Sequence, residues 1–118
     1  MKTKAPQIQP RFRIVCGANI ALGPGKADLL EHVRETGSIA AAARKMGMSY
    51  MRAWMLVKTM ERCFKEPLIE VARGGARHGG AKLTPNGKRV LELYRKIERQ
   101  SLTATRAAQR SILARLTT

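Results

Sequence analysis

Residues 37–54, which read GSIAAAARKMGMSYMRAW, decide the fold. Ser38 and Ser49 are each placed to cap the start of a helix, because a serine hydroxyl accepts a hydrogen bond from an amide of the first turn. Gly47 lies between the two segments and takes the positive φ of a sharp turn at little cost. The stretch therefore predicts two helices, at 39–46 and from residue 50 to about residue 65, joined by a tight turn.

Small side chains favour a close, steep crossing of these two helices. Ala42 and Ala43 allow close approach on the first helix, while Ala53 and Leu56 seat the second helix on the core. Met48 is apolar and is expected to fill the corner beneath the turn. This combination of residues and spacing predicts a helix-turn-helix.

The flanking patterns complete a winged helix-turn-helix. A period of two predicts a strand, helical spacing of apolar residues predicts a helix, and Gly and Pro mark the breaks. The expected elements are a strand at 11–17, a helix at 26–36, strands at 68–72 and 81–84 around a glycine-rich loop, and a long helix from 86 towards 116. The fold class is thus mainly α with a small β-wing.

We expect three segments along the chain. Residues 1–10 read as a disordered basic arm with two prolines. Residues 11–85 form the winged helix-turn-helix domain, and residues 86–118 form a long C-terminal dimerisation helix. The competing interpretation of the last segment is a solvent-exposed tail, because four arginines and several Ser and Thr residues interrupt its apolar seam.

Charge narrows the class of partner. The 118 residues carry 23 Lys and Arg against 8 Asp and Glu, a formal charge of +15. Such an excess favours binding of a polyanion, with nucleic acid first and an anionic membrane second. No apolar run approaches the roughly 20 residues of a membrane span, and the first ten residues do not resemble a secretory signal. We therefore expect a cytoplasmic protein.

The second helix of the motif is expected to enter the DNA major groove, where base edges are distinguishable. Its N-terminal half carries Ser49, Tyr50, Met51 and Arg52, and Lys58 lies further along. Arg52 suits either a bidentate contact to guanine or a phosphate contact, whereas Lys58 and Arg62, further along, suit backbone phosphate or solvent. Trp54 is expected in the core.

Phosphate contacts are also expected outside that helix. Arg73, Arg77 and His78 lie in the glycine-rich loop, where a wing would offer cations to the minor groove or its phosphates. The alternative is a basic hairpin without a defined contact. A nucleotide-phosphate cradle is disfavoured because no GxxxxGK[ST] pattern is present. Ser38, at a helix N-terminus, is expected to place a backbone N–H on phosphate.

The sequence gives little support for a catalytic or metal-binding site. Cys16 and Cys63 have no CxxC spacing and are expected to be reduced, buried thiols, with a redox role left open. His32 and His78 have no plausible Asp or Ser partner nearby. We predict no enzyme, no metal and no cofactor.

The motif residues resemble a known family. Gly37-Ser-Ile, Met48-Ser-Tyr, Ala53-Trp and the basic wing that ends in Leu83-Thr-Pro-Asn-Gly are similar to the N-terminal DNA-binding domain of ModE, the molybdate-dependent regulator with a LysR-like winged helix-turn-helix. The resemblance covers about residues 11–97. It implies a homodimer on a palindromic operator, with the recognition helix and wing placed as above.

One feature of that family is not found in this sequence. In ModE, molybdate is bound by C-terminal β-barrel domains, and no such segment follows the long helix here. We therefore expect either a stand-alone regulator that senses through a separate protein, or one that is not regulated by metal. The leading function is a sequence-specific, DNA-binding transcriptional regulator. The alternative is a non-specific nucleoid-associated or RNA-binding basic protein.

Overall fold

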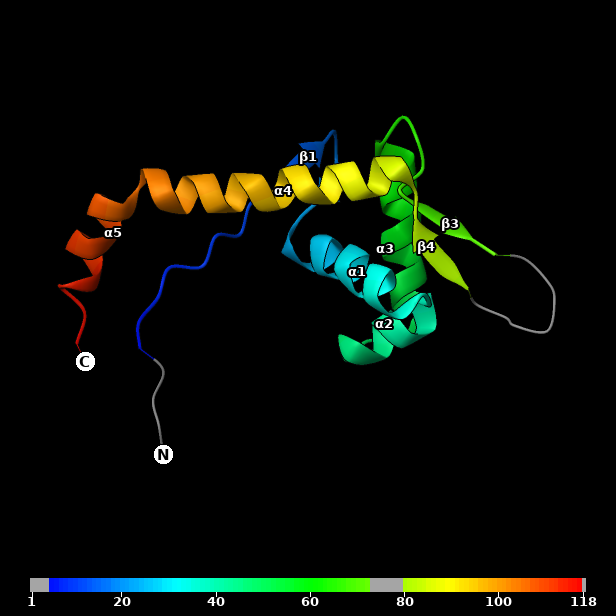
Figure 1. The fold of residues 1–118 in the computed structure, drawn as a ribbon, viewed down its shortest axis with the longest axis horizontal. Helices are drawn as coiled ribbons and strands as arrows, with labels where there is room; N and C mark the ends of the chain where they lie inside the picture. The colour runs from blue at the N-terminus through cyan, green and yellow to red at the C-terminus, as the bar shows by residue number, and fades with distance from the viewer. Residues whose placement is uncertain (1–4, 73–79, 118) are drawn as a thin grey trace.

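The computed structural model describes residues 5–72 and 80–117 (Figure 1). Residues 5–13 carry neither helix nor strand. Along the described chain the elements are β1 (Ile14–Cys16), β2 (Asn19–Leu22), α1 (Pro24–Thr36), α2 (Ile39–Lys45), α3 (Tyr50–Cys63), β3 (Ile69–Val71), β4 (Ala81–Leu83), α4 (Pro85–Ala104) and α5 (Arg106–Leu113). Their order is that of a winged helix-turn-helix with appended helices, as predicted.

The helix-turn-helix forms through the predicted caps. The Ser38 hydroxyl accepts a hydrogen bond from the Ala41 amide at 3.1 Å, and the Ser49 hydroxyl accepts one from the Arg52 amide at 3.1 Å. Gly47 adopts φ +67°, the left-handed conformation that a side chain would disfavour. Both caps and the turn glycine are therefore confirmed.

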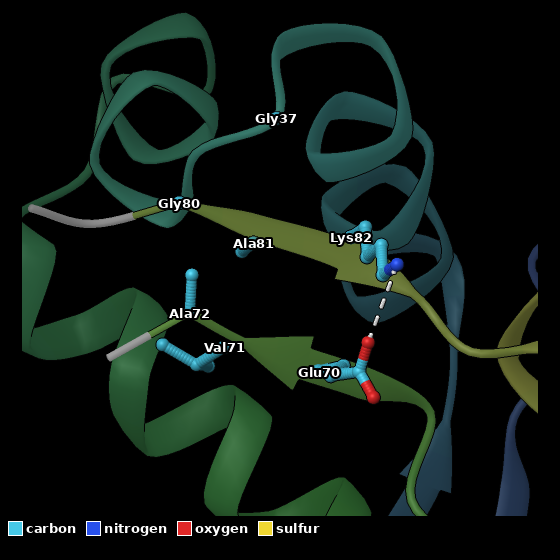
Figure 2. Close-up of a pocket in the computed structure, with 7 residues that line it drawn as sticks. All are labelled: Gly37, Glu70, Val71, Ala72, Gly80, Ala81 and Lys82. Atoms are coloured by element: carbon cyan, nitrogen blue, oxygen red, sulfur yellow. Dashed lines mark ion pairs between the residues drawn. The ribbon is translucent and has the colours of Figure 1, made fainter. Parts of the chain in front are cut away.

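The wing begins on a two-stranded antiparallel stem. β3 pairs with β4, and Glu70 lies opposite Lys82 with 3.5 Å between Oε2 and Nζ (Figure 2). A bridge between Ser38 and Gly80 joins the stem to the loop that precedes α2, and the Ala81 amide donates to the Gly37 carbonyl at 2.8 Å. These bonds fix the wing stem relative to the helix-turn-helix.

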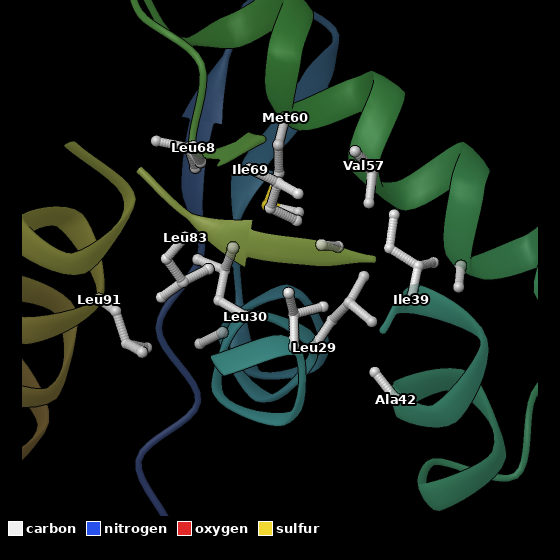
Figure 3. Close-up of a cluster of buried hydrophobic side chains, with 14 of the residues drawn as sticks. Leu29, Leu30, Ile39, Ala42, Val57, Met60, Leu68, Ile69, Leu83 and Leu91 are labelled. Carbon is white, nitrogen blue, oxygen red and sulfur yellow. The ribbon is translucent and has the colours of Figure 1, made fainter. Parts of the chain in front are cut away.

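One apolar core holds the three helices and the wing stem together (Figure 3). Leucines of α1 face Leu83 of β4 on one side and Ile39 of α2 on the other. The buried members are Leu22, Ala27, Leu29, Leu30, Val33, Ile39, Ala42, Ala43, Ala53, Val57, Met60, Leu68, Ile69, Ala81, Leu83, Leu91 and Tyr94. Ala42 and Ala43 of α2 and Ala53 of α3 are fully buried, as the close helix crossing requires. Leu56, expected to seat α3, is only half-buried.

The start of α4 is fastened to the chain that enters β3. The Thr84 hydroxyl accepts from the Gly87 amide at 2.9 Å and donates to the Pro67 carbonyl at 2.7 Å. Gly87 is buried so closely that a Cβ there would lie 2.0 Å from the Leu68 carbonyl oxygen. The Thr-Pro-Asn-Gly segment is thus a helix start that requires glycine at its fourth position.

The N-terminal strand prediction was incomplete. β1 is shorter than residues 11–17 and pairs antiparallel with β2, a strand that the sequence analysis did not predict. Gly17 and Ala18 form the two-residue turn, with Gly17 at φ +61°. Cys16, expected to be buried, is exposed, and Cys63 is half-buried. Cys16 was wrongly expected to be buried because the alternation of side chains along a strand shows which residues share a face. It does not show which face the core covers.

The C-terminal helix is not continuous. It divides at Thr105 into α4 and α5, where a single helix from 86 towards 116 was predicted. The Thr105 hydroxyl donates to the Ser101 carbonyl at 2.6 Å, and the Gln109 side-chain amide donates to the Leu102 carbonyl at 2.7 Å. The Gln109 side chain thus supplies a donor to the Leu102 carbonyl at the break, whereas the Ser101 carbonyl also accepts from the Thr105 amide at 3.2 Å.

The molecule is elongated because α4 extends past the core (Figure 1). The radius of gyration is 17.1 Å, against about 13.5 Å for a compact chain of this length. α5 and the C-terminus lie at the far end of α4, away from the wing. In the described parts of the chain, no helix combines the length and apolar character needed to span a bilayer.

Candidate nucleic-acid interface

The core fixes α3 by one face and leaves the other in solvent. Ala53, Val57 and Met60 are at most 2% exposed, so the helix cannot rotate without losing these contacts. Met51 and Met55 on the opposite face are 68% and 64% exposed. α3 is therefore a rigidly seated helix that presents a defined surface.

A shallow hollow runs along that exposed surface. Its lining residues come at helical spacing from one face of α3, namely Met51, Trp54, Met55, Lys58 and Arg62. Met51 and Lys58 were predicted site residues. Met55 was missed, and Arg62 was assigned only to phosphate or solvent. Counting four positions on from Met51 would have identified Met55 as a neighbour on the same face.

Aromatic and charged groups order part of this surface. The Tyr50 and Trp54 rings meet edge to face with centroids 6.2 Å apart, and the Trp54 indole donates to the Tyr50 hydroxyl. The Lys58 ammonium lies 5.1 Å from the Trp54 ring centroid and 3.5 Å from a carboxylate oxygen of Glu61. Trp54 is half-buried, so it supports the core and also lines the surface. Cation–π and ring contacts of this kind restrict side-chain rotation.

Arg52 differs from Lys58 in its surroundings. Its amide is held by the Ser49 hydroxyl, and its side chain is exposed on the first turn of α3. It forms no ion pair with the described residues. An arginine whose guanidinium is not committed within the protein is suited to bidentate recognition of a partner.

Ser38 occupies a more constrained place. Its hydroxyl caps α2, and its amide donates to the Thr36 hydroxyl at 3.3 Å. The residue is half-buried between the end of α1 and the wing stem. A phosphate contact at this end of α2 would therefore come from the amides that follow Ser38.

The wing cations cannot be placed. Arg73, Arg77 and His78 lie outside the described residues. The stem that leads to them is described, and an open hollow runs beside it, lined by Gly37, Glu70, Val71, Ala72, Gly80, Ala81 and Lys82 (Figure 2).

The charges are separated along the chain and in space. Residues 38–60, which contain α2, the turn and most of α3, have no Asp or Glu and carry Arg44, Lys45, Arg52 and Lys58. Five of the eight acidic residues instead lie on α1 and α4. The sequence analysis did not use this distribution, although it can be read directly from the sequence. The helix-turn-helix is therefore a cationic surface with no nearby acid within its own segment.

Acidic residues on α1 and α4 are gathered around Arg95. Its guanidinium lies 2.9 Å from Asp28, 3.0 Å from Glu31 and 3.1 Å from Glu98. Although partial burial disfavours a charged guanidinium, the hydrogen bonds that it donates to these carboxylates outweigh that cost and raise the pKa of Arg95. These three acids are therefore paired with a cation of the protein itself.

The histidines and other metal-ligating side chains in the described part of the chain form no metal-binding site. His32 Nδ1 lies 3.2 Å from a Glu35 carboxylate oxygen, one turn along α1. Over residues 5–72 and 80–117, no group of three or more His, Cys, Asp or Glu is arranged to hold a metal ion.

Comparisons with curated proteins confirm the resemblance seen in the sequence. The chain is 42% identical over 77 residues to the molybdenum-pterin-binding protein MopB of Rhodobacter capsulatus. The aligned region covers 65% of this chain and 28% of MopB. It is 34% identical over 94 residues to the molybdenum transport protein ModE of Azotobacter vinelandii, or 80% of this chain and 35% of that protein. It is 39% identical over 71 residues to the DNA-binding transcriptional dual regulator ModE of Escherichia coli K12. The aligned region covers 60% of this chain and 27% of that protein. The chain thus spans about a third of the length of these relatives.

A solved structure extends the likeness to three dimensions. The DNA-binding domain in the crystal structure of the CbnR_DBD–DNA complex is 28% identical to this chain, with a TM-score of 0.56. The alignment covers 76% of this chain and 94% of that domain. The family model for bacterial regulatory helix-turn-helix proteins of the lysR family matches residues 26–88, more than half of the chain. This chain therefore belongs to the LysR family of bacterial regulatory helix-turn-helix proteins.

Proposed function

We propose that this protein binds double-stranded DNA sequence-specifically and thereby regulates transcription. The observation that carries the proposal is the acid-free segment 38–60, in which a firmly seated α3 presents exposed cations and large apolar side chains. An α-helix fits the major groove, and cations around it contact phosphate. The family and the DNA complex of the similar domain support the same function. The DNA of a bacterial cell is in the cytoplasm, so we infer that location.

The residues divide by role. Ser49, Tyr50, Met51 and Arg52 lie on the first turn of α3 or just before it, which is the end that enters the groove in helix-turn-helix proteins. We assign Arg52 to a base edge because its guanidinium is exposed and carries no ion pair with the described residues. Lys58 is held near Trp54 and Glu61 and is assigned to phosphate.

The wing and the start of α2 supply further phosphate contacts in this proposal. Arg73, Arg77 and His78 follow the stem strand β3 in the sequence, and the first amides of α2 follow Ser38. These contacts would position the protein on the duplex without reading its sequence.

We further propose that the protein acts as a homodimer through α4 and α5. Leu93 and Ile97 on α4 are 40% and 43% exposed, and Ile112 and Leu116 are 58% and 47% exposed. α4 projects beyond the core, where a second copy would cover these side chains. Two copies would then read half-sites about one helical turn apart, roughly 34 Å.

Selection from genomic DNA tests the function. Purified protein is mixed with random genomic fragments at about 150 mM salt, a concentration at which non-specific phosphate binding is weakened, and the bound fragments are sequenced. We expect an enriched inverted repeat. Recovery of fragments without a shared motif would contradict the proposal and would favour the alternative of a non-specific nucleoid-type protein.

A further inference from the structure

The exposed face of α3 is apolar at its centre. On a helix with about 3.6 residues per turn, Met51 and Met55 project in directions roughly 40° apart. They lie on the side of α3 opposite to Ala53 and Met60, which are buried in the core. Met51 and Met55, here called the methionine pair, therefore point directly towards any partner that α3 contacts.

Ordered and cationic side chains surround the methionine pair. Trp54, Lys58 and Arg62 complete the hollow that the pair lines. The Trp54 ring is held by the edge of Tyr50 and by the Lys58 ammonium. The methionine side chains themselves are unbranched and flexible, so they adapt to the surface that they cover. An apolar centre bordered by cations fits a polyanion that also presents apolar groups.

DNA presents such a group in its major groove. The one alkyl group at the base edges there is the 5-methyl group of thymine, and the other identifying groups are hydrogen-bond donors and acceptors. A methionine thioether is only a weak acceptor, so a methionine pressed against those polar groups would displace their water without replacing the hydrogen bonds. Contact with a thymine methyl group instead removes apolar surface of both partners from water.

We propose that Met51 and Met55 read thymine by its 5-methyl group when α3 lies in the major groove. The inference rests on the proposed DNA-binding function and adds the base that the apolar part of α3 prefers. Residues four apart on a helix have Cβ atoms about 5–6 Å apart, and successive bases of a strand rise by about 3.4 Å. The two thymines should therefore lie within about two base pairs of each other in each half-site.

Removal of single methyl groups from the DNA tests the proposal. The duplex most enriched in the genomic selection is synthesised with each thymine in turn replaced by deoxyuridine, which pairs as thymine does and lacks only the methyl group. Each duplex is titrated with wild type, Met51→Ala and Met55→Ala. The ratio of the dissociation constants for the deoxyuridine and thymine duplexes reports the methyl contact, because any change in the DNA alone is common to the three proteins.

We expect the wild-type ratio to be about four at two thymines of a half-site, which is the effect of removing one methyl group from water. One of these ratios should fall to near unity in Met51→Ala and the other in Met55→Ala. Met55→Leu is the matched control, because leucine is a good helix former and keeps an apolar side chain at this position. This variant should keep most of the wild-type ratio.

Two results would overturn this inference while specific binding to the selected duplex remained. One is a wild-type ratio near unity at every thymine, and the other is a set of ratios that the alanine variants leave unchanged. Weaker dimerisation of the alanine variants without methyl sensitivity would instead assign the methionine pair to a contact with a second copy. Failure to select any duplex would overturn the proposed function, and this inference with it.

Discussion

The Tyr94 hydroxyl in α4 donates a hydrogen bond of 2.7 Å to the backbone carbonyl of Phe12, 82 positions earlier in the chain. The Tyr94 side chain is only 1% exposed, so this bond lies at the edge of the core. The chain that leads into β1 is thereby attached to the helix proposed for dimerisation.

Replacement of Tyr94 by Phe removes this hydrogen bond and keeps the ring. We expect the free energy of unfolding at pH 7 to fall by about 1 kcal/mol, since the Phe12 carbonyl is left without its partner. Urea unfolding followed by circular dichroism measures the change.

The same variant makes a prediction about pH. Burial raises the pKa of Tyr94 in the folded protein. The unfolded phenol, with a pKa near 10, therefore ionises first, and stability that is complete below about pH 10 is lost as the pH rises. Wild type should lose more stability than Y94F between about pH 9 and 11. A stability difference that stays constant over this range would contradict the assignment.

Arg95 should hold α1 against α4. It bridges Asp28 and Glu31 of α1 and Glu98 of α4. Arg95→Ala leaves three carboxylates close together without their shared cation, and we expect a loss of roughly 1–3 kcal/mol, less at high salt. Arg89→Ala is the control, because Arg89 pairs only with exposed Glu92 at 3.4 Å and should cost less than about 0.5 kcal/mol. Equal effects of the two variants would exclude a special role for Arg95.

Local rules predicted the motif well because its signals are local. Ser38, Ser49 and Gly47 each act on residues within a few positions, so caps and turn follow from the sequence. Pro24 at the start of α1 and Gly37 at its end, with φ +71°, are further examples. The break at Thr105 is also local, but it depends on particular side-chain bonds from Gln109 that apolar periodicity does not reveal.

Features that depend on contacts between residues distant in sequence were harder to predict from the sequence. The exposure of Cys16 depends on how the β1–β2 hairpin packs against α3, which no spacing rule encodes. Met55 belongs with Met51 on the exposed face of α3, and helical periodicity could have predicted it. The roles of the site residues remain predictions, because a DNA contact depends on the partner as well as on the chain.

Gly87 should be essential to the start of α4. A methyl group there meets the Leu68 backbone at 2.0 Å, so α4 would have to move away from the chain entering β3. We expect Gly87→Ala to cost about 3 kcal/mol or more. Gly25→Ala, within α1, meets nothing within 4 Å and should be neutral or stabilising, because alanine favours a helix. Thermal melts of both variants measure the contrast, and similar melting temperatures would refute the close packing.

Arg52 tests the proposed reading of bases by α3. If its guanidinium binds a base edge, Arg52→Ala should cost about 1–3 kcal/mol on the selected site and relax the preference at one position of each half-site. Arg99→Ala, which removes an exposed arginine from α4, should leave the preferred sequence unchanged. Binding titrations on the selected site and its single-base variants separate the cases. A uniform loss on all sequences would reassign Arg52 to phosphate.

The proposed dimer makes the last prediction. Leu93 and Ile97 lie four positions apart on the exposed face of α4, so a second copy would bury both together. Replacing both with Lys removes apolar burial and adds like charges to a chain that already carries +15. Because Lys is a good helix former, α4 itself should remain folded, as helical circular dichroism would show.

We expect L93K/I97K to raise the dimer dissociation constant at least about 100-fold, which corresponds to roughly 2.7 kcal/mol. Sedimentation equilibrium measures it directly. Val15→Lys is the control, because it adds a lysine at an exposed apolar position on the hairpin, away from the proposed seam. If the double variant stays dimeric while Val15→Lys dissociates, the interface lies on the N-terminal hairpin and not on α4. A wild-type protein that is monomeric at micromolar concentration would contradict the homodimer proposal. The DNA-binding proposal would be tested separately, by measuring binding to a single half-site.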